Sequence, residues 1–339
     1  MKLIYKQRLG SKTVISILGI KIKFSNHKDS ALEKFWEQWE TDYNPQKLEK
    51  DLKKYIASQT EIPEYNREIR LILISTLIEN NQLQEAETEL EKYVNQYGYA
   101  DIYAYPLICA HLAKRESGDE RIFQTAKIFE QLEEKRLNNS LSALLAGKSV
   151  AVVGNSPNLI GRNNGAKIDG FDYVVRFNNY RLEGYENDYG HKTDIWICCQ
   201  ANDIQNKPEN EIRKFSYILY NVDLMHTKLR GKCFQNICQN LQYGVPISYI
   251  DASFKKELKI TEVKYPSSGL SGLFHIHNLH PLTRKDIFGF SFLENDTNYY
   301  DHYFAKRSKR KIKKFLKNCH HNFEKENIFL NVLFGSDNG

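Results

Sequence analysis

The sequence lacks several features that would assign a chain at once to a class. Its six cysteines are scattered, and no pair has the spacing of a zinc site or a redox motif, which favours reduced thiols in a cytoplasmic protein. The apolar piece TVISILGI near the N-terminus is too short to span a bilayer, and no small-residue cleavage site follows it. We therefore expect neither a signal peptide nor a transmembrane helix.

A strong charge excess is also absent. The net charge is +6 over 339 residues, which favours anionic partners but not nucleic acid, because a nucleic-acid surface is usually more basic and interleaved with aromatics. Lysines and arginines gather in one stretch, from Lys306 to Lys317. This stretch is either a solvated helix face or a peripheral contact with anionic lipid or with a phosphate-bearing acceptor. We expect a cytoplasmic chain, with the inner face of the membrane as the place of any such contact.

The pattern of the chain changes near residue 147. Before it, residues 31–43, 47–59 and 67–97 have apolar residues at helical spacing and many Glu/Lys pairs. Residues 77–98 predict one helical hairpin around an Asn-Asn turn, similar to a tetratricopeptide-like helix pair but without a recurring period. We expect an all-α domain over residues 1–146 that acts as a scaffold or interaction surface.

After Gly147, short apolar runs alternate with helical segments. The runs are SVAVVG, FDYVVRFN, TDIWICC, FSYILYN and KDIFGF. This alternation predicts a Rossmann-like α/β domain over residues 147–339, a parallel sheet with helices on both faces. Ligands of such sheets bind at the carboxyl ends of the strands, so we expect the site in the loops after Val153, Phe177 and Phe288.

The loop after the first of these runs is short and polar. Gly154 lets a nucleotide approach the backbone closely, and Asn155 and Ser156 supply donors and acceptors. The Gly-x-Gly-x-x-Gly pattern is missing, which argues against an NAD-linked oxidoreductase. An Asp-x-Asp metal motif, typical of sites for diphosphate sugars, is not evident either.

Four blocks then follow in a distinctive order. The first comprises VVGNSPNLIG, IDGFDYVVRFNN and GYENDYGHKTD, the second YPSSGLSGLFHIHNL and KDIFGF, the third YYDHYF, and the fourth HHNFEKE. Their succession resembles the large, small, third and very small sialylmotifs of the eukaryotic-type sialyltransferase family. The resemblance spans residues 150–326. It implies a GT-A-like variant of the Rossmann-like sheet, a CMP-activated sugar as donor, and neither a metal nor a cofactor.

The same resemblance implies roles for individual residues. His302 would steady the departing phosphate, and His321 would be the general base that deprotonates the acceptor, with Glu326 as its motif partner. A histidine with an ordinary pKa of about 6.5 suits base catalysis at neutral pH. Three residues would shape the site without doing chemistry: Asp188, Gly190 and Thr193. The donor would contact Gly154, Asn155, Ser156, Asn178, Ser267, Ser268, Gly269, Gly289 and Phe290.

The expected reaction is inverting transfer of sialic acid, a 2-keto sugar acid, from CMP to a hydroxyl of a glycan or glycolipid. The motif cysteines that vertebrate members join as a disulfide are missing, which suggests a soluble, bacterial-like member that builds capsule or lipopolysaccharide. Two alternatives remain open. One is a Kdo transferase with the same site, since Kdo is also CMP-activated and carries a carboxylate on its anomeric carbon. The other is a non-catalytic helical-repeat adaptor with a degenerate nucleotide-binding layer.

Overall fold

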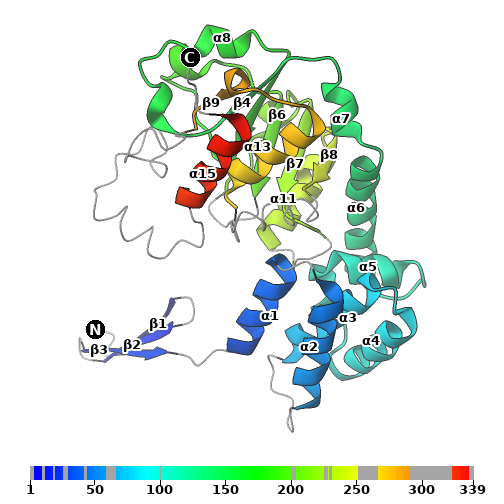
Figure 1. Cartoon of the computed structure of the whole chain (residues 1–339). Helices are drawn as coiled ribbons and strands as arrows, with labels where there is room; N and C mark the ends of the chain where they lie inside the picture. The colour runs from blue at the N-terminus through cyan, green and yellow to red at the C-terminus, as the bar shows by residue number, and fades with distance from the viewer. Residues whose placement is uncertain are drawn as a thin grey trace. The chain divides into compact units, whose positions relative to one another are not determined.

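The structure is a computed structural model in which the chain forms two compact units, Met1–Gly98 and Tyr99–Gly339 (Figure 1). The residues that it describes are 4–9, 12–17, 20–25, 30–41, 44–58, 66–99, 101–199, 204–224, 228, 231–250, 266–290 and 323–335.

The first unit begins with a three-stranded antiparallel sheet rather than a helix. Its strands are β1 (Ile4–Leu9), β2 (Lys12–Ile17) and β3 (Ile20–Ser25), hydrogen-bonded in that order. The expectation of an all-α domain is therefore wrong for this segment. The sequence carries the reason, since β3 alternates apolar and polar residues, β2 is rich in β-branched residues, and glycines stand between the strands at positions 10 and 19.

Four helices follow in the first unit, α1 (Ser30–Thr41), α2 (Pro45–Ala57), α3 (Asn66–Glu79) and α4 (Leu83–Tyr97). They confirm the helices expected from the apolar spacing. The α3–α4 hairpin turns at Asn80 and Asn81, and Asn81 has the left-handed φ of +58° that asparagine tolerates well. One stripe of α4 is buried, formed by Ala86, Leu90 and Tyr93.

The second unit contains a six-stranded sheet in which every pairing is parallel, as the alternating pattern predicted. The strand order is β8-β7-β6-β5-β4-β9. The strands are β4 (Val150–Val153), β5 (Tyr173–Phe177), β6 (Ile195–Cys199), β7 (Tyr217–Asn221), β8 (Ile247–Tyr249) and β9 (Ile287–Phe288). Sequence patterns did not reveal β8, because three residues are too few to show a period.

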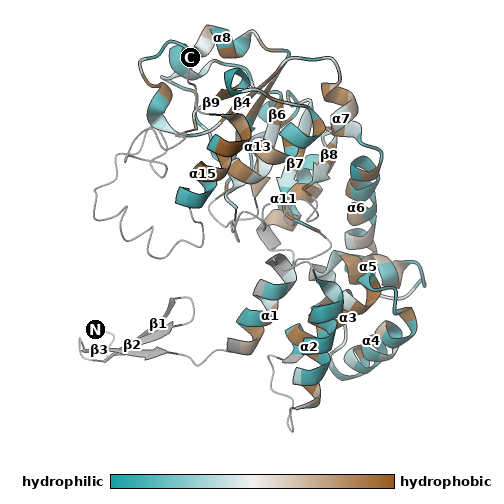
Figure 2. Ribbon diagram, in the orientation of Figure 1, coloured by the Kyte–Doolittle hydropathy of each residue, from teal (hydrophilic) through white to brown (hydrophobic). Residues whose placement is uncertain are grey.

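Helices cover both faces of this sheet. On one face, α7 (Ser140–Leu145), α13 (Ser268–Leu279) and α15 (Phe323–Phe334) bury side chains against alternate residues of the strands. Figures 1 and 2 show α13 and α15 side by side with hydrophobic stretches, and the rings of Phe274 and Phe329 meet there at 5.4 Å. The other face is packed against α5 (Pro106–Ala113), α6 (Glu120–Leu137) and α11 (Gly231–Leu241). Shorter helices in the loops are α8 (Gly165–Asp169), α9 (Glu186–Tyr189) and α10 (Glu209–Ile212).

The second unit begins well before the boundary expected between residues 146 and 147. Helix α6 belongs to the sheet domain because Phe129 and Leu132 lie in the same buried cluster as the sheet residue Tyr220. The Ser140 hydroxyl at the start of α7 also lies 2.8 Å from the Tyr217 hydroxyl of β7. The sequence analysis assigned residues 1–146 to one helical domain and carried no information about which core α6 joins.

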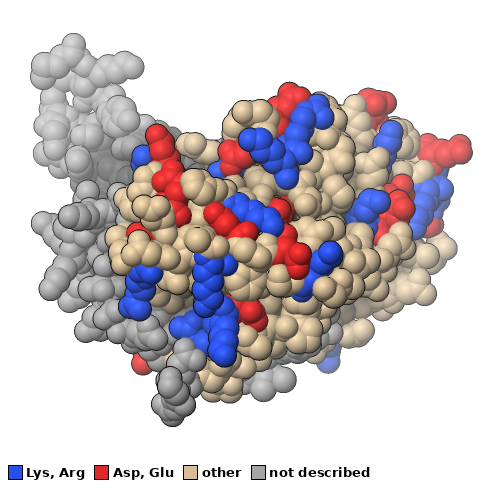
Figure 3. All heavy atoms as spheres, turned by 90° about the horizontal axis from the view of Figure 1, so that it is seen from above, with Lys and Arg blue, Asp and Glu red and all other residues tan. Residues whose placement is uncertain are grey.

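Charged side chains of both signs are interspersed on the face drawn in Figure 3. In the described segments, no helix combines the length and the apolar character needed to cross a bilayer. The basic stretch from Lys306 to Lys317 lies outside the described residues, so its expected contact stays a prediction.

The position of α13 depends on Gly272, which touches the sheet directly. A Cβ at this residue would lie 2.5 Å from Cε1 of Phe177 and 2.8 Å from Cδ1 of Ile197. We expect Gly272→Ala to lower the free energy of unfolding by about 1–2 kcal/mol, since overpacking outweighs the gain in helix propensity. Chemical denaturation measures this change. Gly170→Ala is the matched control, because its Cβ would meet atoms only at 3.4 Å, and an equal loss in both variants would contradict the packing argument.

Candidate functional site

The backbones of β4 and β9 touch just beyond the ends of these strands. The amide of Gly154 donates to the carbonyl of Phe288 at 2.8 Å, and that of Ser156 donates to Gly289 at 2.9 Å. A Cβ at Gly154 would lie 2.5 Å from the Gly289 oxygen, and Gly289 itself has a φ of +66°. The chain leaves β4 toward β5 on one side and returns to β9 on the other. This edge is therefore the topological switch point, where open parallel sheets bind ligands.

Two asparagines join the neighbouring strand ends to this edge. Nδ2 of Asn155 donates to the carbonyl of Phe177 at 3.1 Å. Asn178 has a left-handed φ of +50°, and its Oδ1 accepts from the amide of Cys199 at 3.0 Å. Each amide group thus has one polar atom fixed by the strands, which orients its other polar atom along the carboxyl edge of β4 and β5.

The remaining residues of the first loop are largely enclosed. Ser156 is buried, and its carbonyl accepts a short hydrogen bond from the Tyr189 hydroxyl. The ring of Phe290 is buried and meets Phe177 edge to face at 6.0 Å. Sequence reasoning missed Asn158, whose Nδ2 donates to Phe290 O at 2.7 Å and whose buried Oδ1 has no partner among the described residues. Its place in the same polar loop was the available signal.

Ser267, Ser268 and Gly269 form the start of α13. The contact of Gly272 with Phe177 and Ile197 brings this end of the helix to the carboxyl edge of β5 and β6. Oγ of Ser267 caps the helix by accepting from the amide of Leu270 at 3.2 Å. The partial positive charge of a helix N-terminus favours an anionic group nearby.

Glu326 of α15 holds Ser267 in place. Its two carboxylate oxygens accept from the Ser267 amide at 2.7 Å and from the Ser267 hydroxyl at 2.6 Å, although 59 residues separate the two positions. The Glu326 side chain is fully buried, and this burial raises its pKa to about 7 against the opposing effect of the Ser267 hydrogen bonds. The second and fourth sequence blocks are thereby joined. The Ser267 hydroxyl already makes two hydrogen bonds: it accepts from the amide of Leu270 and donates to Glu326.

The three expected supporting residues stabilise the loop between β5 and β6. Asp188 accepts from the amides of Gly161 and Asn163 at 2.8 and 2.9 Å, and these bonds lower its pKa. Gly190 has a φ of +75°, and a Cβ there would collide with the Asp169 carboxylate. Oγ1 of Thr193 accepts from Nε of Arg176 at 3.0 Å.

Arg176 is the residue at the base of this loop that sequence reasoning left without a role. Its side chain is buried, with 1% exposed, and it donates to the carbonyls of Lys192 at 2.9 Å and Tyr189 at 2.6 Å. Its position in the Asp-x-Val-x-Arg-x-Asn pattern was the signal that could have identified it. The guanidinium fixes the loop from within the fold and lies away from solvent.

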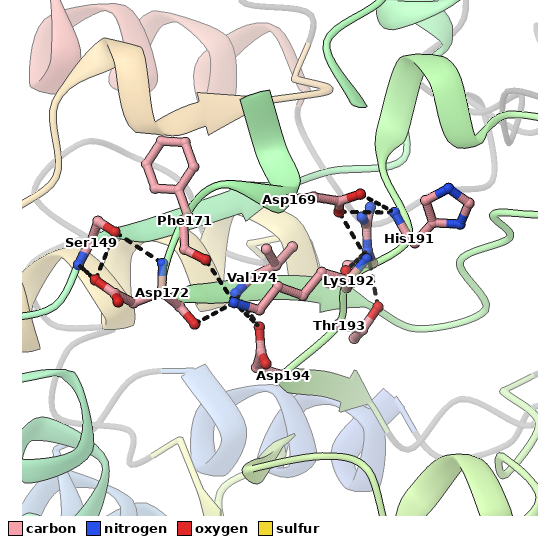
Figure 4. Close-up of polar contacts among 10 residues, drawn as sticks. Ser149, Asp169, Phe171, Asp172, Val174, His191, Lys192, Thr193 and Asp194 are labelled. Carbon is pink, nitrogen blue, oxygen red and sulfur yellow. Dashed lines mark hydrogen bonds and ion pairs between the residues drawn. The ribbon is translucent and has the colours of Figure 1, made fainter. Parts of the chain in front are cut away.

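The amino ends of β5 and β6 carry a further polar network, drawn in Figure 4. Asp169 accepts from the amides of His191 and Lys192, both at 2.9 Å, and the Lys192 ammonium donates to the carbonyls of Phe171 and Asp172, both at 2.6 Å. Asp194 accepts from the amide of Val174 at 2.8 Å. These contacts close the loop at the edge of the sheet opposite Asn155 and Asn178.

The structure describes only some of the histidines of the four sequence blocks. His302 and His321 lie outside the described residues. His277 of the HIHNLH stretch lies on α13, where its Nδ1 accepts from the amide of Leu282 at 3.0 Å and its ring packs against Phe334 at 5.0 Å. Across the described ranges, no three His, Cys, Asp or Glu side chains come close enough together to hold a metal ion.

The raised pKa of Glu326 predicts a pH-dependent stability. A carboxyl group with a pKa of 4.5 when unfolded and about 7 when folded adds stability that is complete below pH 4.5 and is lost as the pH rises through 7. Relative to wild type, Glu326→Gln should therefore flatten the fall in the free energy of unfolding over this range, by ~3 kcal/mol.

Urea denaturation at several pH values measures this difference. Glu324→Gln on the exposed side of the same helix is the matched control and should keep the wild-type slope. A Glu326→Gln variant with an unchanged slope would contradict the buried position of this carboxyl group.

Comparison with known proteins shows similarity to one family. Residues 117–228 match the family model of glycosyltransferase family 29 (sialyltransferase). The CMP-N-acetylneuraminate-beta-1,4-galactoside alpha-2,3-sialyltransferases of Mus musculus and Homo sapiens are each 25% identical over 223 residues, which cover 59% of this chain and 58% of each relative. A sialyltransferase-like protein 2 of Oryza sativa subsp. indica is 46% identical over 48 residues, 14% of this chain and 12% of that protein.

Two solved structures are also similar to this chain. A crystal structure of a mammalian sialyltransferase has a TM-score of 0.41 and 20% identity, covering 67% of this chain and 81% of that one. A mammalian sialyltransferase in complex with Gal-beta-1-3GalNAc-ortho-nitrophenol has a TM-score of 0.39 and 21% identity, with coverages of 57% and 68%. The chain thus spans a little over half the length of the curated relatives it matches. Over residues 117–228, the chain is therefore similar to glycosyltransferase family 29, the sialyltransferase family.

Proposed function

We propose that the chain is a glycosyltransferase that takes a sugar from a CMP-activated donor and transfers it to a hydroxyl of a glycan or glycolipid. The observation that carries the proposal is the carboxyl edge of the sheet, where the Gly154–Gly289 contact, two oriented asparagines and the start of α13 lie together. Donors of this kind suit a monophosphate, which has a single negative charge in the bridge to its sugar.

The proposed donor is CMP-sialic acid. The relatives of mouse and human described above are named for CMP-N-acetylneuraminate. The N-terminus of α13 is well oriented for the sugar carboxylate or the phosphate, since its first amides are unpaired within the helix. Gly154 would hold the loop after β4 against Gly289 and Phe290, with Asn155 and Asn178 at the ribose or phosphate.

The proposed mechanism is inverting and needs no metal ion. His321 would remove the proton from the acceptor hydroxyl as its oxygen attacks the anomeric carbon, and His302 would stabilise the phosphate that leaves on the opposite face. Glu326 would not touch the reacting atoms. Its carboxylate would hold the start of α13 next to the donor by accepting two hydrogen bonds from Ser267. Synthesis of bacterial capsule or lipopolysaccharide is the proposed setting.

The proposal extends to the parts of the chain outside the sheet. The α3–α4 hairpin, with its buried stripe and its exposed opposite face, would serve as a tetratricopeptide-like interaction surface or scaffold. The basic stretch from Lys306 to Lys317 would contact anionic lipid at the inner face of the membrane, near a glycolipid acceptor.

Calorimetric titration with CMP, UDP and NAD in buffer that contains EDTA tests the donor site. We expect selective binding of CMP, and we expect Asn155→Ala to weaken it about tenfold, because a polar contact and the orienting bond to Phe177 are both lost. Asn95→Ala on the exposed face of α4 is the control and should bind as wild type does. Binding of UDP or NAD in place of CMP would contradict the proposal.

Transfer assays with CMP-sialic acid and CMP-Kdo test the chemistry. We expect transfer from CMP-sialic acid, and we expect His321→Ala to lower kcat at least a hundredfold while CMP affinity is kept, because a general base contributes about 10²–10⁴-fold. If CMP-Kdo is a donor and CMP-sialic acid is not, the proposed sugar is wrong and the proposed mechanism still stands. A His321→Ala variant with normal kcat would refute the assignment of the base.

A further inference from the structure

The second unit has a cavity that the proposed reaction does not use. Its volume is about 560 Å³, within the usual range for small-molecule sites. Its walls come from three segments, residues 180–183 after β5, residues 191–193 before β6 and residues 207–215 around α10. The segment of residues 191–193 is held by the Arg176 and Asp169 contacts described above, so this wall of the cavity is preformed.

The cavity is separated from the start of α13 by the sheet. Phe215 lines it and meets Trp196 of β6 at 5.8 Å between ring centroids. Ile197, the next residue of β6, lies under α13 on the other face. Because successive residues of a strand point to opposite faces, the cavity and α13 lie on opposite sides of the sheet.

The lining combines an excess of cations with a few carboxylates. Arg181, Lys207 and Lys214 line it together with Glu183 and Glu211, which leaves one more positive than negative charge. Lys192 also lines it, but its ammonium is bonded to the carbonyls of Phe171 and Asp172. A polyphosphate would be repelled by the two carboxylates. A ligand with one negative charge and several hydroxyl groups would find a cation for its charge and carboxylate and amide acceptors for its hydroxyls.

Lys207 is held in a fixed position within this lining. Its ammonium lies 3.7 Å from the centroid of the Tyr180 ring and 3.0 Å from the Glu211 carboxylate, and its side chain is only 15% exposed. The Tyr180 hydroxyl donates to the same carboxylate at 2.8 Å. An ammonium has three N–H donors, and this arrangement orients one toward Glu211 and one toward the ring. The third N–H is left for a ligand. Because the Lys207 side chain is already held in place, such binding would cost little side-chain entropy.

We propose that this cavity binds an acidic saccharide unit, a sugar that carries one carboxylate or one phosphate. Lys207 and Lys214 would pair with the acid group, and Glu183 and Asn210 would hydrogen-bond sugar hydroxyls. The site does not depend on the proposed transfer reaction, since none of the residues proposed to contact CMP lines it. Such a site would let the chain bind an acidic glycan at a place other than the proposed transfer site.

Ligand-observed NMR with glucuronic acid, glucose 6-phosphate and neutral glucose tests the site, and its two acidic arms distinguish a carboxylate from a phosphate. We expect at least one acid to bind and glucose not to bind. Lys214→Gln should weaken the acid about fivefold, since this exposed lysine supplies a charge without supporting the fold. Lys127→Gln on the exposed side of α6 makes the same charge change away from the cavity and should have no effect.

Saturating CMP and the Asn155→Ala variant separate this site from the donor site. Binding of the acid that persists under both conditions supports the proposal even where CMP itself fails to bind. The proposal is overturned if neither acid binds, if glucose binds equally well, if CMP displaces the acid, or if Lys214→Gln binds as wild type does.

Discussion

The close approach of Gly154 and Gly289 is the constraint on which the rest of the sheet domain depends. Strand β9 has only two residues, so its pairing with β4 relies on the two hydrogen bonds that continue past the strand ends. Any side chain at Gly154 would force the backbones apart. With both glycines in place, a segment that follows β4 by more than a hundred residues returns to its edge and completes the switch point.

The Ser267–Glu326 contact extends that edge to the helices. Burial of a carboxyl group is costly unless it is hydrogen-bonded, and Ser267 supplies both an amide and a hydroxyl. The pair fixes the first turn of α13 relative to α15 at the place where the helix N-terminus faces the strand ends. A group whose pKa is raised to about 7 makes this junction sensitive to pH near neutrality.

The loop between β5 and β6 depends in a similar way on a buried charge. Arg176 donates to carbonyl groups of this loop, and Asp169 accepts from its amides. Asp188, which lies in the loop, accepts from the amide of Gly161 and so ties the loop to the segment after β4. One side of the loop thereby supports the polar strand ends, and the other forms a wall of the cavity near Lys207. A single rigid segment thus serves two surfaces of the unit.

The sequence predicted the strands of the sheet where β-branched residues form an uninterrupted run, as in β4, and it predicted helices where the apolar spacing is regular, as in α4. The short β8 and the N-terminal sheet were missed, because three residues show no period and the β-branched run of β2 was interpreted as part of a single apolar piece. Helix α6 belongs to the second unit because its apolar side chains pack into the core of the parallel sheet. That information lies in tertiary packing and not in spacing.

In the candidate site too, some features could be predicted from the sequence and others depend on tertiary packing. Gly154, Asn155 and Asn178 could be placed at the strand ends because each follows a recognisable strand. The link between Ser267 and Glu326 could not be derived from spacing, since 59 residues separate them and only the packing of α13 on α15 brings them together. Arg176 had a signal in its motif, but its burial and its carbonyl partners are properties of the folded loop.

The central claim is that the carboxyl edge of β4, β5 and β9 and the start of α13 form one CMP site. Hydrogen–deuterium exchange with and without CMP tests it directly. The account predicts slower exchange in residues 154–160, 175–179 and 266–274 together, since these segments surround the proposed nucleotide. Slower exchange confined to residues 207–215, or no change in any of the three segments, would contradict it.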